Sequence, residues 1–531
     1  MRPGSKKYRS MFAFSQAKKV KRSDKLVLLT LSVAGFLSIL RFGDWWFRPE
    51  HIGEFWPYVI LSLFFWYGIL RLILIWINYL KVKKVDTPKP EPGLSVAIFT
   101  TSSPGEPVEM FEKTLAACAR IDYPHTTYLL DDTRDPAFRA CAERHGAVWL
   151  ELVGIPGAKA GKINAALQKT TEDFILVLDP DHIPFPYFFD HTLGFFKDPQ
   201  TGFVQVTQAY YNQYRSFTAR GAAEQTYTFY GPTQMGLFGV GGAVAIGANC
   251  TFRRAALESI GGHGIGLAED LITSIRIHAQ GWKSVYNPVV VSRGLVPEDF
   301  GSFCKQQLKW SRGLFEVLFA EVPRLFKNLT GWQRLSYLGI TTYYLVGATA
   351  FYFTLIPFLF FLTQLNAARM DFTEFLLYGL PIVVIAVAIY LYVQKWLGHR
   401  KTERGLHWRG MILKYACWPV FLLGFLLGVV NADIPYIPTA KRAVKGYFTP
   451  FARPLVVHVI FFVITLGILF YYRRFVASET YLLATRQIVW AMLGFATLSL
   501  TMSIGGIYAA MSSNNISTED AWDSVDVTQI K

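Results

Sequence analysis

The sequence has few cysteines, no recognisable signal-peptide cleavage site and fewer acidic than basic residues. Its five cysteines (Cys118, Cys141, Cys250, Cys304 and Cys417) are odd in number and scattered, with no zinc-binding spacing. A disulfide framework is therefore excluded, and we expect reduced residues that help to fill the core. The basic N-terminal stretch lacks a small-residue cleavage site, so we expect a cytoplasmic anchor flank in place of a secretory signal.

The formal net charge of +15 comes from 53 Lys and Arg against 38 Asp and Glu. Such an excess could indicate nucleic-acid binding, but the positive residues cluster beside apolar runs, at 18–25, 81–84 and 400–409. That placement is typical of membrane proteins, whose cytoplasmic loops and headgroup-facing segments are rich in Lys and Arg. We therefore predict a lipid bilayer as a partner, and no nucleic acid.

The chain is 52% hydrophobic, and several apolar runs have the length that a helix needs to cross a bilayer. The candidate spans are 26–42, 56–80, 335–365, 375–393, 456–471 and 488–510. The run 411–430 has two interpretations. If it spans the membrane, the basic loop around Lys441 lies outside; if it is interfacial or re-entrant, that loop stays cytoplasmic and about six spans remain. The charge distribution favours the second.

Between the second and third candidate spans, short β-rich runs alternate with helical patterns. This alternation predicts an α/β domain with a mainly parallel sheet, beginning with a strand at 95–100, a helix at 108–120 and a strand at 127–130. Ligands bind at the carboxyl ends of such strands. The polar residues that fall there are Thr101, Glu106, Asp131 and Asp132. An isolated pair of aspartates more often starts a turn, so these residues gain weight only from motifs further along the chain.

Four later motifs point to a nucleotide-sugar site. Asp179 and Asp181 follow the apolar run 174–178 and suit a divalent cation that holds a diphosphate. A glycine-containing loop opens a helix near 158, so its amides and Lys159 or Lys162 could meet phosphate oxygens.

Glu269 and Asp270 suit a helix N-terminus, and a carboxylate there could also act as a general base. In the segment QQLKW (306–310), Trp310 offers a flat face to a sugar ring. An interfacial helix with a Trp belt is the competing interpretation of that segment.

In this order the motifs resemble those of processive family-2 glycosyltransferases, the family of the bacterial cellulose synthase catalytic subunits and the related β-glucan, chitin and hyaluronan synthases. The matching segments are Leu130-Asp131-Asp132, Lys159-Ala160-Gly161, Asp179-Pro180-Asp181-His182, Glu269-Asp270 and QQLKW. The resemblance implies a GT-A-type α/β cytosolic domain inserted in an α-helical transmembrane domain of about six spans plus interfacial helices.

The implied activity is polymerisation of a UDP-sugar by an inverting mechanism, with translocation of the polysaccharide across the membrane. UDP-glucose and a β-glucan are preferred, because the segments 179–184 and 294–299 look more like those of glucan than of hyaluronan synthases. A hyaluronan- or chitin-type synthase and the transfer of one sugar to a lipid carrier remain alternatives. The implied partners are a UDP-sugar donor, a growing polysaccharide acceptor and the bilayer, with accessory export subunits left open.

The resemblance also implies roles for single residues. Asp270 would be the catalytic base with Glu269 as a supporting neighbour, and Asp179 and Asp181 would hold Mg²⁺ or Mn²⁺. The residues expected to bind donor or acceptor are Thr101, Glu106, Asp131, Asp132, Lys159, Gln306, Gln307, Lys309, Trp310, Thr439 and Lys441. Lys309 stands where the family usually has Arg, so the point charge of an ammonium group takes the place of a planar guanidinium fork.

Thr439 and Lys441 belong to a segment, 436–441, that resembles the gating loop of cellulose synthases, with Tyr and Pro at two positions where the family has Phe and Val. A basic loop beside the membrane explains Lys441 equally well.

The expected organisation has five parts, in a multi-pass protein of the plasma (inner) membrane with a cytoplasmic catalytic domain. They are a basic segment with two transmembrane helices (1–85), the cytosolic glycosyltransferase domain (86–300), amphipathic interfacial helices with QQLKW (301–335), a transmembrane channel region (336–510) that contains a gating-like loop (431–453), and a disordered tail (511–531). Only about twenty residues follow the last span, so we expect no β-barrel receptor domain for cyclic-di-GMP in this chain.

Overall fold

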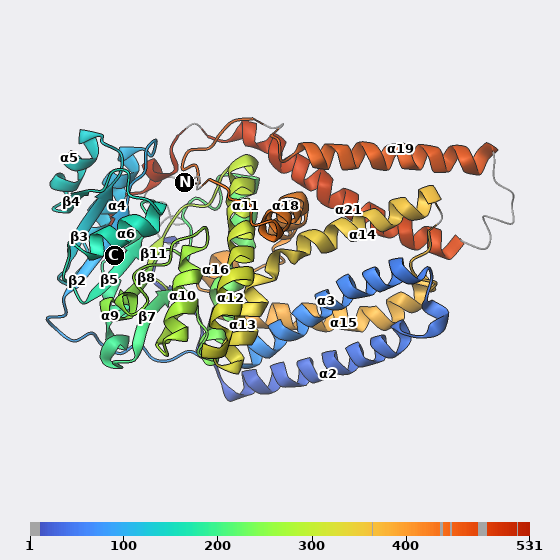
Figure 1. Ribbon diagram of the computed structural model, residues 1–531, viewed down its shortest axis with the longest axis horizontal. Helices are drawn as coiled ribbons and strands as arrows, with labels where there is room; N and C mark the ends of the chain where they lie inside the picture. Colours follow the sequence, from blue (N-terminus) through green and yellow to red (C-terminus); the bar gives the residue numbers. More distant parts are fainter. Residues whose placement is uncertain are drawn as a thin grey trace.

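The computed structural model describes residues 11–363, 365–435, 439–446, 449–475, 486–517 and 519–530. A sheet-containing domain forms one end of the molecule, and a bundle of long helices extends from it (Figure 1). The helices and strands of the two parts alternate along the chain in the order predicted, with two long helices before the sheet and the remaining ones after it. An α/β domain inserted in a helical membrane domain is therefore confirmed.

The sheet has seven strands in the order β4-β3-β2-β5-β8-β7-β9. Their bounds are β2 (Val96–Thr101), β3 (Thr126–Asp131), β4 (Val148–Glu151), β5 (Phe174–Leu178), β7 (Thr201–Val206), β8 (Cys250–Arg253) and β9 (Lys283–Asn287). β2 pairs in parallel with β3 and β5, while β8 is antiparallel to both of its neighbours. The carboxyl ends of β2, β3 and β5 therefore meet at one edge, which is where the polar motifs lie.

Both faces of the sheet are covered, which explains why β2 is apolar from Val96 to Phe99. Val96 and Ile98 pack in one core cluster with Cys118 of α4 (Val108–Cys118). The intervening Ala97 and Phe99 pack in another, with residues of α6 (Ala158–Leu167). A strand buried on both sides has no polar face and reads as a continuous apolar run.

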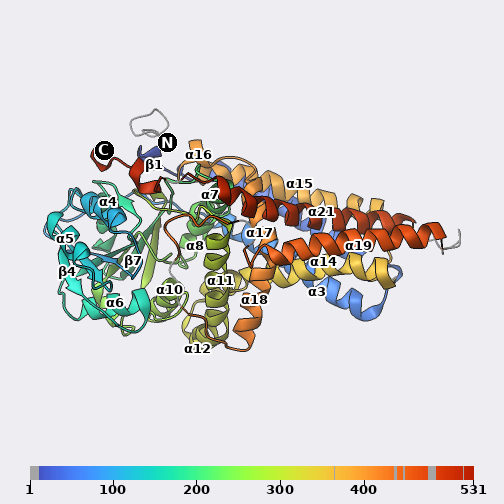
Figure 2. The same cartoon turned by 90° about the horizontal axis from the view of Figure 1, so that it is seen from above.

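The long helices are α2 (Arg22–Trp46), α3 (Phe55–Leu80), α14 (Val346–Thr363), α15 (Phe372–Val393), α19 (Arg453–Phe475) and α21 (Arg486–Ser512). Within the described residues, five helical segments are long and apolar enough to cross a membrane, or six if one bent pair counts as a span. The apolar part of α19 is shorter, but α19 lies along α14 and α21 (Figures 1 and 2). Exposed side chains such as Leu63, which is 67% exposed, suit contact with lipid.

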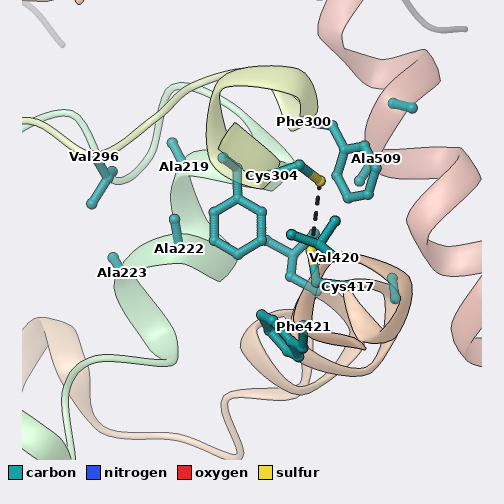
Figure 3. Packing of buried hydrophobic residues seen from close by; sticks show 14 of the residues in the cluster. Ala219, Ala222, Ala223, Val296, Phe300, Cys304, Cys417, Val420, Phe421 and Ala509 are labelled. Atoms are coloured by element: carbon teal, nitrogen blue, oxygen red, sulfur yellow. Dashed lines mark hydrogen bonds between the residues drawn. The ribbon is translucent and has the colours of Figure 1, made fainter. Parts of the chain in front are cut away.

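The bent pair consists of α17 (Trp408–Ala416) and α18 (Trp418–Val429), which meet at 49°. Figure 2 shows α18 running across the direction of the long helices, against α11 (Phe300–Glu316). Figure 3 shows the contact between them, where the Sγ atoms of Cys304 and Cys417 lie 3.6 Å apart beside Phe421. This arrangement favours the interfacial interpretation of 411–430. All five cysteines are buried free thiols, as predicted.

The prediction of a disordered tail is wrong. Short 3-10 turns form at Ala521–Ser524 and Val527–Gln529, and the side chains of Trp522 and Ile530 are each 1% exposed. Trp522 packs in a cluster with Met110 and other residues of α4. The apolar residues of the tail are too sparse to form a core of their own, but a surface supplied by the catalytic domain buries them.

Candidate active site

One cavity of about 1010 Å³ connects the polar edge of the sheet with the helices of the membrane part. At the sheet edge it is lined by Thr101, Glu106, Lys159, Asp179 and Asp181. At the other end its wall includes Arg71 of α3, Lys414 of α17, and Tyr343. The cavity therefore joins the polar edge of the sheet to the region between the membrane helices.

Asp179 and Asp181 lie just after β5 and, with His182, form the group of the site that could hold a metal ion. One ligand atom from each of the three lies within 4.8 Å of the others. Lys159 Nζ donates to Asp179 Oδ1 at 2.5 Å, and Lys441 Nζ donates to Asp181 Oδ2 at 2.8 Å. Two lysine ammonium groups therefore pair with the carboxylates that the sequence assigned to a metal.

These ion pairs keep both carboxyl groups charged. Burial alone would raise the pKa of Asp181, but Lys441 and His182 outweigh it and hold that pKa well below its usual range. Burial acts in the same direction on the pKa of Asp179, and Lys159 again lowers it. Both aspartates are thus ionised at neutral pH, as hard-cation ligands must be.

The pKa of Asp270 is shifted in the opposite direction to those of Asp179 and Asp181. Asp270 lies in the first turn of α10 (Glu269–Ala279), where its Oδ1 accepts a hydrogen bond from the amide of Leu271 at 2.7 Å. Burial, followed by the charge of Glu269, raises the pKa of Asp270 to about 7. A carboxylate that gains a proton near neutral pH is suited to general-base catalysis.

Asp131 and Asp132 are placed differently from the other predicted residues, since neither is among the described residues that line the cavity. Asp131 is fully buried, and it accepts hydrogen bonds from Ser102 Oγ at 2.5 Å and Trp149 Nε1 at 2.9 Å. Asp132 accepts from the amide of Gly154 at 3.0 Å. Through these hydrogen bonds, the two carboxylates hold together the segments at the ends of β2, β3 and β4.

The QQLKW segment lies on α11, and its Gln306, Gln307, Lys309 and Trp310 all line the cavity. The side chain of Gln307 is buried, and its Oε1 accepts a hydrogen bond from Tyr344 at 3.2 Å. Its Nε2 has no hydrogen-bond partner among the described residues. A buried amide donor on a cavity wall has a free position for an oxygen of a ligand.

Thr439 and Lys441 also line the cavity, so the described part of the segment that resembles a gating loop reaches the site. Residues 436–438 of the same motif lie outside the described residues. The contact between Lys441 and Asp181 joins residues 260 positions apart, so no local sequence pattern could reveal it.

Sequence reasoning missed the polar residues at the membrane end of the cavity. Arg71 Nη1 donates to the carbonyl of Gly339 at 2.8 Å, and Lys414 Nζ lies 4.5 Å from the centroid of the Tyr343 ring. A charged residue within an apolar run is the one signal that could have pointed to them, because such residues in membrane helices usually face a cavity or a partner.

Two family models match this chain. The one described as glycosyltransferase like family 2 matches residues 92–313, and the one described as cellulose synthase matches residues 258–411. Residues 92–313 therefore form a family-2 glycosyltransferase domain, and the resemblance noted in the motifs is confirmed.

The relatives include the UDP-forming cellulose synthase catalytic subunits of two bacteria. The subunit of Komagataeibacter sucrofermentans is 28% identical over 301 residues, which is 55% of this chain and 40% of that protein. The subunit of Xanthomonas axonopodis pv. citri is 30% identical over 251 residues, or 46% of this chain and 34% of that protein. The match thus spans less than half of the length of these relatives.

Among solved structures, a mannosyltransferase from Pyrobaculum calidifontis, in complex with GDP-Man and Mn²⁺, overlaps with a TM-score of 0.46 and 17% identity. The overlap covers 71% of this chain and 100% of that one.

Proposed function

We propose that the protein is a membrane-embedded, processive, inverting glycosyltransferase that polymerises a UDP-sugar, with UDP-glucose as donor and a β-glucan as product, and that it moves the polymer across the membrane. The observation that carries this proposal is the continuous cavity, which links the acidic sheet edge to the membrane helices. A polymerase that exports its product needs such a connection. The family-2 domain and the relatives named as UDP-forming cellulose synthases support the same reaction.

In the proposed reaction, Asp270 accepts the proton of the acceptor hydroxyl as that oxygen attacks the anomeric carbon. Its raised pKa makes it a stronger base than an ordinary aspartate while leaving it largely ionised above neutral pH. Asp179 and Asp181 would hold Mg²⁺ or Mn²⁺, which would neutralise the charge of the departing diphosphate. Lys159 lies beside Asp179 and can contact the same phosphate oxygens.

The acceptor end of the polymer would lie against α11. Trp310 lines the cavity there and can stack on a sugar ring, and the free Nε2 of Gln307 can donate to a sugar oxygen. The positive residues beside the membrane helices would face the cytoplasm, and with them the catalytic domain, in the inner membrane.

Transfer assays with purified full-length protein test this function. The protein is incubated with Mg²⁺ or Mn²⁺ and, in parallel, with radiolabelled UDP-glucose, UDP-GlcNAc or UDP-GlcA. We expect a long product from UDP-glucose that a linkage-specific glucanase degrades. If the polymer forms from another donor instead, the product is of the chitin or hyaluronan type and not a glucan. A lipid-extractable product with one sugar would contradict polymerisation, and no transfer from any donor would contradict the enzyme.

The pH dependence of the reaction should follow the ionisation of Asp270. Asp270 must be unprotonated to accept a proton and its pKa is raised to about 7, so kcat/KM for the donor should fall as the pH drops below that value and level off above it. The slope of the acidic limb should approach about tenfold per pH unit. Burial also raises the pKa of Glu106 to about 7. The acidic limb of the pH profile should therefore be measured in Glu106→Gln and compared with that of the wild type. If the limb disappears in this variant, it belongs to Glu106, which would contradict the role of Asp270.

Trp310→Ala should shorten the polymer more than it raises KM for the donor, because the ring serves the acceptor. Stacking contributes about 1 kcal/mol beyond burial of area, which is enough to shift the balance between elongation and release. Gel filtration of labelled product and donor kinetics measure the two effects. Unchanged product length would leave Trp310 as a membrane-surface residue only.

The neighbouring Lys309 supplies the contrast. Lys309→Ala should mainly raise KM for the donor, whereas Lys309→Arg, which introduces the residue that is usual in the family, should keep near wild-type kinetics. A shorter product from Lys309→Ala at unchanged donor KM would contradict this division of roles.

A further inference from the structure

The basic loop (439–446) carries two adjacent cations that point to different partners. Lys441 pairs with Asp181 inside the cavity. Arg442 pairs with Asp520 of the C-terminal tail through two parallel hydrogen bonds, from Nε to Oδ1 at 3.1 Å and from Nη2 to Oδ2 at 2.9 Å. The fork of a guanidinium on a carboxylate fixes orientation as well as distance. One side of the loop therefore contacts the active site, and the next residue contacts the tail.

The tail is itself anchored to the catalytic domain. Trp522 is 1% exposed among α4 residues that include Phe111 and Leu115. Lys113 Nζ, also on α4, donates to the carbonyl of Val525 at 3.1 Å, and Arg120 Nη2 donates to that of Ile530 at 3.2 Å. The tail is thus seated on a helix that packs against the sheet of the catalytic domain.

Trp522 also links this anchor to the loop. The guanidinium carbon of Arg442 lies 5.6 Å from the centroid of the Trp522 ring, within the range of a cation–π contact. A second carboxylate, that of Glu109 on α4, lies 3.6 Å from Arg442 Nη2. Arg442 is therefore surrounded by groups that the tail and α4 bring together.

A third contact ties the loop to the helix that carries QQLKW. The amide of Val444 donates to Asp299 Oδ2 at 3.1 Å, while Asp299 Oδ1 caps α11 by accepting from the amide of Ser302 at 2.8 Å. Together with the tail, this contact fixes the loop at two positions directly after Lys441. The lysine is thereby held over the aspartates of the site.

We propose that the C-terminal tail (519–530) positions the basic loop over the active site, with Arg442 and Asp520 as positioning residues for Lys441. The proposal rests on the proposed function and deepens it. A segment outside the family-2 domain would control how Lys441 contacts the diphosphate of the donor. Neither Arg442 nor Asp520 pairs with Asp179 or Asp181; Arg442 lies on the cavity wall beside Lys441, whereas Asp520 is not among the described residues that line the cavity and acts through the loop.

The position of the loop can be measured without any catalytic assay. All five native cysteines are buried, so a single Ala443→Cys substitution gives a maleimide-labelling site with little background. In the full chain, adding Asp520→Asn should raise the labelling rate of this cysteine about 2- to 5-fold, the effect expected from losing one partly exposed ion pair. Glu519→Gln removes the same charge one residue away and should leave the rate unchanged.

Donor kinetics complete the test. Asp520→Asn and Arg442→Gln should each raise KM for the UDP-sugar with little change in kcat, and the double variant should be no worse than either single one. The exchange Arg442→Asp with Asp520→Arg should restore part of the lost affinity. Equal labelling of Ala443→Cys with and without Asp520→Asn would overturn the proposal, as would increased labelling with an unchanged KM. Absence of transfer by the wild type would instead count against the proposed function, and the labelling result would stand.

Discussion

Asp270→Asn should abolish polymer synthesis while UDP binding stays close to that of the wild type. The amide keeps the size of the side chain but cannot accept the proton of the acceptor hydroxyl, and loss of a general base costs about 10²- to 10⁴-fold in rate. Asp270 is not among the residues grouped as metal ligands, so the nucleotide should still bind. Initial rates and calorimetric titration with UDP measure the two quantities.

The neighbouring carboxylate is the control for this variant. Glu269 also lies in the first turn of α10 and raises the pKa of Asp270. Glu269→Gln should therefore lower the pH at which the acidic limb falls and reduce the rate less than Asp270→Asn does. Near wild-type synthesis by Asp270→Asn, or a larger loss from Glu269→Gln, would rule out Asp270 as the base.

Asp181→Ala should remove metal-dependent activity and weaken UDP binding in the presence of Mg²⁺ or Mn²⁺. The side chain is 5% exposed, and its carboxylate is one of the two that can supply oxygen ligands in the site. We expect a loss of roughly 10- to 100-fold or more in apparent metal affinity, since changes even behind a metal ligand have effects of that size. Titration of UDP binding with metal measures it.

Asp190→Ala is a matched control, because Asp190 lies on the same domain but is exposed and is not among the residues that line the cavity. It should leave the metal titration unchanged. If UDP affinity depends on metal as strongly in Asp181→Ala as in the wild type, the metal is held elsewhere.

The strands and the order of the site residues could be predicted because they rest on local patterns. A strand predicted at 95–100 is observed as β2, Val96–Thr101, and the apolar run before Asp179 is observed as β5. Strand ends then place Thr101 and Asp179 at one edge by topology alone. Periodicity and turn residues suffice for this part of the fold.

What the sequence could not reveal depends on contacts between distant segments. Asp131 stays a predicted nucleotide ligand, but its hydrogen bonds from Ser102 and Trp149 come from segments that no local pattern connects to it. The tail looked disordered because nothing in its own sequence shows that α4 offers a surface for Trp522. The partner of Lys441 depends on the folding of a loop onto a strand end far away in sequence.

The most direct measurement of the central claim uses proteoliposomes that contain the full chain. UDP-glucose and metal are added only to the outside, so that molecules with an outward-facing catalytic domain react, and labelled product is then treated with a β-glucanase before and after detergent. A polymerase that exports through the cavity should give a long product that resists the glucanase until detergent opens the vesicles. Product that is digested without detergent, or label that extracts with the lipid as a single sugar, would contradict the account.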